Sequence, residues 1–128
     1  MDEPIVFISH NRIKPGLFED FDRYYRESLP SIESGKPDTL VQLTFVSDDL
    51  TDVSIVRVFP DAQALDMQLQ GADIRSKKAY QLIDPIGIEI YGVPGSFAME
   101  MMKKVAGSGI QVKIMPRYIR GFIRPQSG

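Results

Sequence analysis

The sequence predicts a single α+β domain with a ferredoxin-like βαββαβ core. Two helices should cover one face of an antiparallel sheet, and a further helix and strand should follow at the C-terminus. Three observations support this prediction. The chain has 128 residues, a length that suits one domain. Its hydrophobic residues change repeatedly between the two-residue period of a strand and the three- to four-residue spacing of an amphipathic helix. Polar residues, prolines and glycines separate these segments.

The N-terminal segment predicts one strand and one long helix. The compact apolar run Ile5–Ile8 predicts the strand, which should end at residues 9–12. After a break at Pro15, apolar residues recur at three- and four-residue steps and predict a helix over residues 17–32. Pro30 should kink or end this helix, because proline cannot donate the backbone hydrogen bond that a helix interior needs.

Two strands joined by a polar loop should follow. Residues 40–46 alternate between apolar and polar side chains, which predicts a half-buried strand. Residues 53–59 are apolar on both faces, with Arg57 as the single charge. The polar residues 47–52 between them predict a hairpin loop.

A second helix and a fourth strand complete the predicted core. Asp61 is of a type that caps helix N-termini, so the helix should begin just after it. Gly71 should interrupt the helix, which is expected to resume over residues 73–80. Residues 86–93 again alternate and predict the fourth strand.

Residues 94–128 are predicted to extend the ferredoxin-like core of residues 1–93 within the same domain. Ser96 should cap a third helix. A fifth strand is expected in two parts, residues 110–114 and 118–123, on either side of a proline. A proline at this place suits an edge strand or a bend.

The second face of the predicted sheet also carries apolar residues, especially in the first and third strands. No predicted core helix remains to cover that face. A second copy of the same sheet is the simplest partner, since two-fold dimers are the commonest assembly. We therefore expect a homodimer.

The composition excludes several kinds of site. The chain has no cysteine, which rules out disulfides, thiolate metal sites and cysteine nucleophiles. One histidine and scattered carboxylates do not form a recognisable metal-ligand set, so neither a metal nor another cofactor is expected. The sequence contains no glycine-rich phosphate-binding loop, and its serines show no arrangement with a histidine and an acid.

Membrane association is not expected, because no apolar stretch approaches the roughly 20 residues that a membrane span needs. Residues 1–4 are acidic in character and precede only a short apolar run, unlike a signal peptide. These features, with the absence of cysteine, predict a cytoplasmic protein.

The net charge of −2 conceals an uneven distribution. The segment from Gly95 to the end carries six basic residues and one acidic residue, so its charge is +5 and that of the remainder is −7. The basic residues stand singly among apolar ones. This pattern favours a solvated face, or a face that meets acidic surface on the same or a partner subunit, over nucleic-acid binding.

Three stretches resemble the antibiotic-biosynthesis-monooxygenase (ABM) family of dimeric α/β barrels: residues 11–16 after the first strand, residues 43–59 across the central hairpin, and residues 61–66 at the start of the second helix. The resemblance covers Pro4 to Val93. It implies a ferredoxin-like dimer. It also implies either a cofactor-independent oxygenase acting on quinols or polyketide aromatics, or a heme-degrading oxygenase.

The sequence departs from the heme-degrading branch of that family. Members of the branch carry an asparagine after the first strand, and a tryptophan and a heme-ligating histidine in the second helical region. Asn11 matches the asparagine. Gln68 stands near the tryptophan position, where many other relatives carry a histidine, and Ala79 or Tyr80 stands near the ligand position. The resemblance therefore argues against heme degradation, because an axial iron donor is missing.

His10, Asn11 and Tyr80 are the candidate catalytic residues. Histidine titrates near neutrality and suits acid–base work. The asparagine amide can orient a carbonyl or a reduced oxygen species. Strand alternation sends His10 and Arg12 to one face and Asn11 to the other, provided that the strand continues so far. The alternatives are a solvent-exposed loop histidine and an asparagine that bonds its own turn.

The candidate substrate-binding residues are polar groups on predicted strands and helices: Gln42, Thr44, Arg57, Gln68 and Tyr91. A few such groups fix the orientation of a ligand in a mainly apolar pocket. The alternative for the strand residues is cross-strand hydrogen bonding at a dimer interface. For the tyrosines it is a buried hydroxyl bonded within the protein without any ligand.

Three functions follow from these observations. The first is a cofactor-independent, monooxygenase-like protein that binds a small hydrophobic aromatic or quinone-like molecule. In it, His10 or Tyr80 would be the base, and Asn11 or Arg57 would stabilise the anion. The second is a non-catalytic dimeric module that binds a small ligand or a partner. The third is nucleic-acid or membrane-surface binding through the basic C-terminal segment.

Overall fold

A computed structural model describes residues 3–70, 77–106 and 109–124 of the chain. Its sheet has the strand order β2-β3-β1-β4-β5. The central strand β1 (Ile5–Ile13) pairs antiparallel with β3 (Asp52–Phe59) on one side and with β4 (Ile83–Tyr91) on the other. Beyond them, β2 (Val41–Val46) pairs antiparallel with β3, and β5 (Gln111–Met115) pairs parallel with β4. The first four strands thus form the predicted ferredoxin-like sheet.

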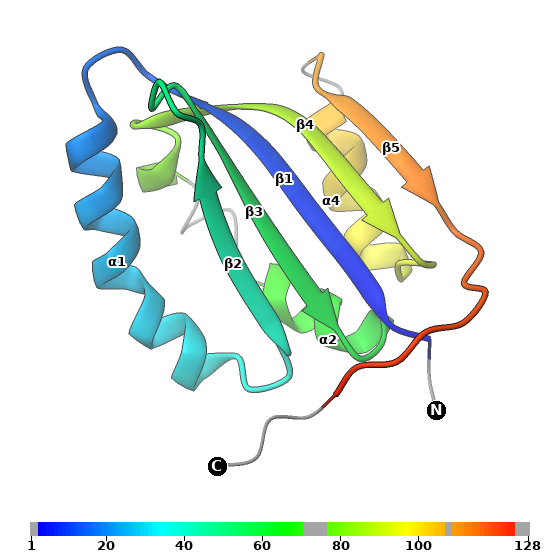
Figure 1. Cartoon of the computed structure of the whole chain (residues 1–128). Coiled ribbons are helices and arrows are strands. Elements are labelled where there is room, and N and C mark those ends of the chain that lie inside the picture. Colours follow the sequence, from blue (N-terminus) through cyan, green and yellow to red (C-terminus); the bar gives the residue numbers. More distant parts are fainter. Residues whose placement is uncertain (1–2, 71–76, 107–108, 125–128) are drawn as a thin grey trace.

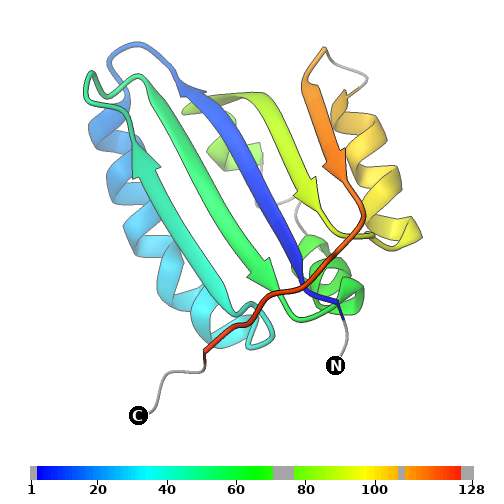
Figure 2. The same ribbon diagram turned by 45° about the vertical axis from the view of Figure 1, so that its right-hand side comes forward.

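The helices α1 (Phe18–Gly35), α2 (Ala62–Leu69) and α4 (Ser96–Ala106) lie on one face of the sheet, and Figure 2 shows the other face open toward the viewer. Figure 1 shows α1 beside β2 at one edge and α4 behind β4 and β5 at the other. The α+β class and the helical layer predicted from the sequence are therefore confirmed. In the part of the chain described, no helix is long and apolar enough to cross a membrane.

Two clusters of buried side chains hold the helices on the sheet. One joins α2 and α4 to the strands and includes Phe7, Phe59 and Leu65. The other joins α1 to the opposite ends of the strands and includes Phe21 and Ile83. Burying a large aliphatic or aromatic side chain contributes roughly 1.5–3 kcal/mol, so these clusters supply much of the stability of the fold.

Strands β1 and β4 are longer than the sequence predicts. β1 continues through residues 9–12 to Ile13, because it is paired on both edges over this length. β4 begins at Ile83 and contains Pro85. The β1–β4 register shifts between His10 and Asn11, and this irregularity accommodates a residue without a backbone N–H.

Several predicted boundaries are wrong. Pro30 lies inside α1, which continues to Gly35. Ser96 is the first residue of α4 and not its cap. Residues 118–123 form no strand, since regular structure ends with β5 at Met115. The predicted interruption at Gly71 and the first part of the predicted helix over residues 73–80 lie outside the described residues, whereas residues 77–79 are helical.

Candidate functional site

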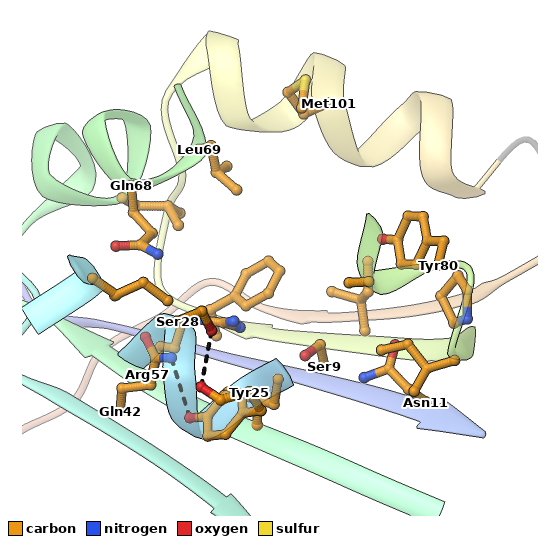
Figure 3. A pocket seen from close by; sticks show the side chains of 18 of the residues that line it. Ser9, Asn11, Tyr25, Ser28, Gln42, Arg57, Gln68, Leu69, Tyr80 and Met101 are labelled. Carbon is orange, nitrogen blue, oxygen red and sulfur yellow. Dashed lines mark hydrogen bonds between the residues drawn. The ribbon is translucent and has the colours of Figure 1, made fainter. Parts of the chain in front are cut away.

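A cavity of about 370 Å³ lies between the helices and the sheet. Its walls are mostly apolar and combine side chains from both buried clusters with polar groups from α1, α2 and three strands. Figure 3 shows the polar side chains directed into the same space. A volume of this size lies at the lower end of the range of small-molecule sites, and mainly apolar walls with a few placed polar groups are typical of them.

Asn11 is the most deeply buried polar residue of the cavity wall, with 4% of its surface exposed. It stands on β1 in alternation with Phe7 and Ser9, so all three side chains face the helices and line the cavity. The Asn11 amide makes no hydrogen bond within the described part of the chain. The amide faces the cavity, so it is available to hydrogen-bond a bound molecule.

Tyr25 of α1 forms a second polar point in the cavity (Figure 3). Its hydroxyl oxygen accepts a hydrogen bond from Thr44 Oγ1 at 2.5 Å and another from Gln42 Nε2 at 3.3 Å. With both interactions accepted, the Tyr25 proton remains to donate to a ligand. The Gln42 Oε1 atom is buried without a hydrogen-bond partner. This end of the cavity therefore combines a hydroxyl donor with an amide acceptor.

Arg57 and Gln68 complete the polar lining. Arg57 lies on β3, and its guanidinium stands 5.9 Å from the centroid of the Phe7 ring in a cation–π arrangement. Gln68 of α2 is buried and accepts a hydrogen bond from Thr39 Oγ1 at 2.9 Å. Arg57 places a positive charge beside apolar walls, where electrostatic attraction to an anion is stronger than in water.

Tyr80 stands at the mouth of the cavity. It lines the cavity with 41% of its surface exposed, and it follows the short helical segment of residues 77–79. A tyrosine in this position contacts both a bound molecule and solvent. Figure 3 shows it on the same side of the cavity as Asn11.

His10 and Tyr91 lie on the other face of the sheet, outside the cavity. His10 Nδ1 lies 2.7 Å from Ser54 Oγ, and His10 Nε2 lies 2.5 Å from Glu89 Oε2. The Tyr91 hydroxyl donates to Glu89 Oε1 at 2.6 Å. The expectation that no serine stands with a histidine and an acid is therefore wrong. We call His10, Ser54, Glu89 and Tyr91 the open-face network. The sheet separates this network from the cavity.

Hydrogen bonding within the open-face network shifts two pKa values. The hydrogen bond from Tyr91 lowers the pKa of the Glu89 carboxyl, and the contact with His10 lowers it further. The same carboxylate raises the pKa of the Tyr91 hydroxyl, because it favours the protonated phenol.

The structure brings together most of the residues that the sequence singled out, but not all. Asn11, Gln42, Arg57, Gln68 and Tyr80 line one cavity. Thr44 contacts the lining residue Tyr25 without lining the cavity itself. His10 and Tyr91 do not reach it, so His10 cannot be the base for a molecule bound there.

Sequence reasoning missed Tyr25 and Ser28, both on the cavity side of α1. Tyr25 is one of the regularly spaced residues that predict the helix over residues 17–32. The available signal was its hydroxyl, because a tyrosine on a buried stripe needs a hydrogen-bond partner. Among the described residues, no group of three or more histidines or carboxylates could hold a metal ion.

No family model matches the sequence, and no curated protein matches it. Several solved structures do share its fold. MupZ from Pseudomonas fluorescens is 18% identical, with a TM-score of 0.73 over 97% of each chain. SnoaB from Streptomyces nogalater, a cofactor-independent oxygenase, is 11% identical, with a TM-score of 0.60 over 73% of this chain and 96% of that one.

A third solved structure is a protein from Chloroflexus aurantiacus assigned to the antibiotic biosynthesis monooxygenases. It is 16% identical, with a TM-score of 0.55 over 73% of this chain and 95% of its own. This chain has the ABM fold. At these identities the likeness establishes the fold alone. The coverage differs among the three, since MupZ matches nearly the whole of this chain whereas SnoaB and the Chloroflexus protein match about three quarters.

Proposed function

We propose that the protein binds a small hydrophobic aromatic or quinone-like molecule in the cavity and oxidises it with O₂ without a metal or flavin. The observation that carries this proposal is the Asn11 amide, which belongs to a residue only 4% exposed and faces a mainly apolar cavity. The ABM fold, shared with a cofactor-independent oxygenase, supports it.

The cavity residues suit the chemistry of a phenolic substrate. The substrate hydroxyl loses its proton through Tyr80, which accepts it and passes its own proton to solvent at the cavity mouth. The positive charge of Arg57 stabilises the resulting anion, and the Asn11 amide donates a hydrogen bond to the oxygen of that anion. The anion gives one electron to O₂, and the two radicals combine at carbon. The peroxide anion so formed takes up a proton from solvent, loses water and leaves a quinone carbonyl.

Oxygen uptake tests this proposal. Dihydroxynaphthalene should be consumed, whereas naphthalene, which has no hydroxyl to ionise, should not be. Asn11→Ala and Arg57→Gln should each lower the rate about tenfold or more. His10→Gln is the matched control, because its side chain lies across the sheet, and it should retain turnover. Absence of uptake with every phenol tested would refute the proposed oxygenation.

A second function, ligand binding without catalysis, is favoured by the position of His10. No histidine lines the cavity, so the group best suited to remove a proton near neutrality is absent from it. Fluorescence titration with dihydroxynaphthalene under nitrogen separates the two functions. Tight binding without oxygen uptake in air indicates a binding module, and Asn11→Ala should weaken that binding.

We also propose that two copies associate through the open face of the sheet. This face exposes apolar side chains, with Leu43 51% and Phe45 62% exposed on β2. An apolar face of this kind is typical of a protein–protein interface. Light scattering over a dilution series should report twice the mass of the chain at micromolar concentration. A single-chain mass throughout would refute the homodimer.

A further inference from the structure

Residues 116–124 form an extended segment after β5, which we call the C-terminal arm. It contains no regular structure and carries three arginines, Arg117, Arg120 and Arg124, without any acidic residue. Its apolar side chains are unusually open to solvent: Ile119 is 88% exposed and Phe122 is 82% exposed. Such exposure is costly for an isolated segment, so the arm has the character of an interaction surface.

The arm passes one end of the sheet, on the side of the uncovered face. Figures 1 and 2 both show it crossing where β1 begins and β3 ends. The strand register identifies this end, because Met115 pairs with Tyr91, Tyr91 with Val6, Val6 with Val58, and Val58 with Val41. The β2–β3 loop lies at the opposite end of the same sheet.

That loop forms a surface of complementary character, which we call the hairpin tip (Phe45, Val46, Asp48, Asp49 and Leu50). Asp48 and Asp49 are exposed, and neither makes an ion pair within the described residues. Phe45 and Leu50 are exposed apolar residues. The hairpin tip therefore offers acidic and apolar groups to match the basic and apolar groups of the arm.

Leu50 provides a second observation at the hairpin tip. Its φ angle is +62°, in the left-handed region that asparagine and glycine adopt more easily than leucine. The loop hydrogen bonds of Asp49, from Ser47 and Thr51, hold the turn in this shape. Folding within one chain gives no reason for an exposed leucine here. A partner that covers the leucine would account for an apolar residue at this position.

The arm does not reach the hairpin tip of its own chain. The arm and the tip lie at opposite ends of strands that are about 20–30 Å long, and the arm runs across the strands at its own end. In an assembly with opposed open faces and a two-fold axis perpendicular to the strands, the partner's hairpin tip lies at this end of the sheet, which the chain's own tip does not reach. Each arm then meets one tip.

We propose that the C-terminal arm of each copy docks on the hairpin tip of a second copy, through arginine–aspartate attraction and apolar contact. This inference rests on the proposed homodimer and goes beyond it, because it assigns a role to a segment that follows the sheet. The acceptor surface is made of Phe45, Leu50 and Asp48, and the donor surface is made of the arm's arginines with Ile119 and Phe122.

Charge reversal tests the docking. Arg117→Glu with Arg120→Glu should weaken self-association about tenfold in sedimentation equilibrium at physiological salt. Asp48→Lys should weaken it in the same direction. Lys103→Glu with Lys104→Glu is the matched control, since it makes the same change of charge on exposed positions of α4 and should leave the dissociation constant within twofold.

Mixing the variants gives the decisive measurement. An arm-reversed copy and a hairpin-reversed copy carry compatible charges, so native mass spectrometry should show more mixed dimer than either same-variant dimer. If no arm or tip variant changes the dissociation constant of the dimer, the docking is refuted, whereas the homodimer is not. A wild-type protein that is monomeric throughout would overturn both. Arm variants that lose retention on heparin without any change in self-association would overturn the docking in favour of a polyanion.

Discussion

At the scale of single residues, strand alternation decides which groups can act together. Asn11 and His10 are neighbours in sequence, yet the sheet separates them, with Asn11 in the cavity and His10 in the open-face network. This separation could be predicted once β1 was allowed to continue past Ser9. The partners of His10 could not be predicted, since Ser54 and Glu89 stand 44 and 79 residues away along the chain.

Asn11→Leu should stabilise the protein while weakening ligand binding. The leucine has a similar volume and replaces a polar amide on the cavity wall with an apolar group, so the free energy of unfolding should rise by about 1 kcal/mol. Affinity for dihydroxynaphthalene should fall about tenfold or more. Urea denaturation and fluorescence titration measure the two effects. A loss of stability greater than about 1 kcal/mol would mean that the amide has a structural partner.

Glu89→Gln should lower stability at neutral pH and have little effect in acid. The folded state holds the pKa of Glu89 below its usual value, through Tyr91 and then His10. The carboxylate therefore contributes stability above the unfolded pKa of about 4.3, and this contribution disappears as the pH falls through the lower folded pKa. We expect a difference of about 1 kcal/mol between wild type and variant at neutral pH.

Urea denaturation at several pH values checks this pH dependence. Glu33→Gln is a suitable control, because Glu33 is an exposed residue of α1 and makes no ion pair among the described residues. If the Glu89→Gln difference stayed the same down to about pH 3, the network would not depend on the ionised carboxylate.

At the scale of elements, periodicity predicted which segments form helices and strands, but long-range contacts set their ends. Pro30 does not end α1, and the pairing of β1 on both edges extends it beyond its apolar run. The start of α4 is set by another helix. Asp66 of α2 accepts a hydrogen bond from the Ala98 backbone N–H at 3.2 Å, a contact that no local pattern around Ser96 reveals.

Asp66→Ala should destabilise the protein by about 1 kcal/mol, because it removes a carboxylate from the N-terminus of α4. Gln63→Ala, at an exposed position of the same helix, should have little effect. Gly95→Ala should act through the same contact, since a Cβ atom there would lie 2.7 Å from Asp66 Oδ2 and displace it. In a double-mutant cycle followed by urea denaturation, the two changes should be less than additive. Fully additive effects would show that the two substitutions do not act through the same contact.

At the scale of the whole molecule, the order of elements carried more information than any single motif. Alternating strand and helix patterns predicted the two-layer fold, and the similar solved structures share it. The cavity between the layers could not be predicted. Its volume depends on how the side chains of both buried clusters fail to fill the space between Phe7, Phe21 and Phe59, and periodicity does not encode such packing.

The central position of β1 has a consequence for the timing of folding. This strand leaves the ribosome before both of its neighbours, and its second neighbour begins only at Ile83. During synthesis its edges have no partner, and most sheet contacts join distant parts of the chain. Such topologies fold more slowly than those with mainly local contacts, and they expose strand edges to aggregation meanwhile. The yield of native protein should therefore respond to the speed of translation and to chaperones.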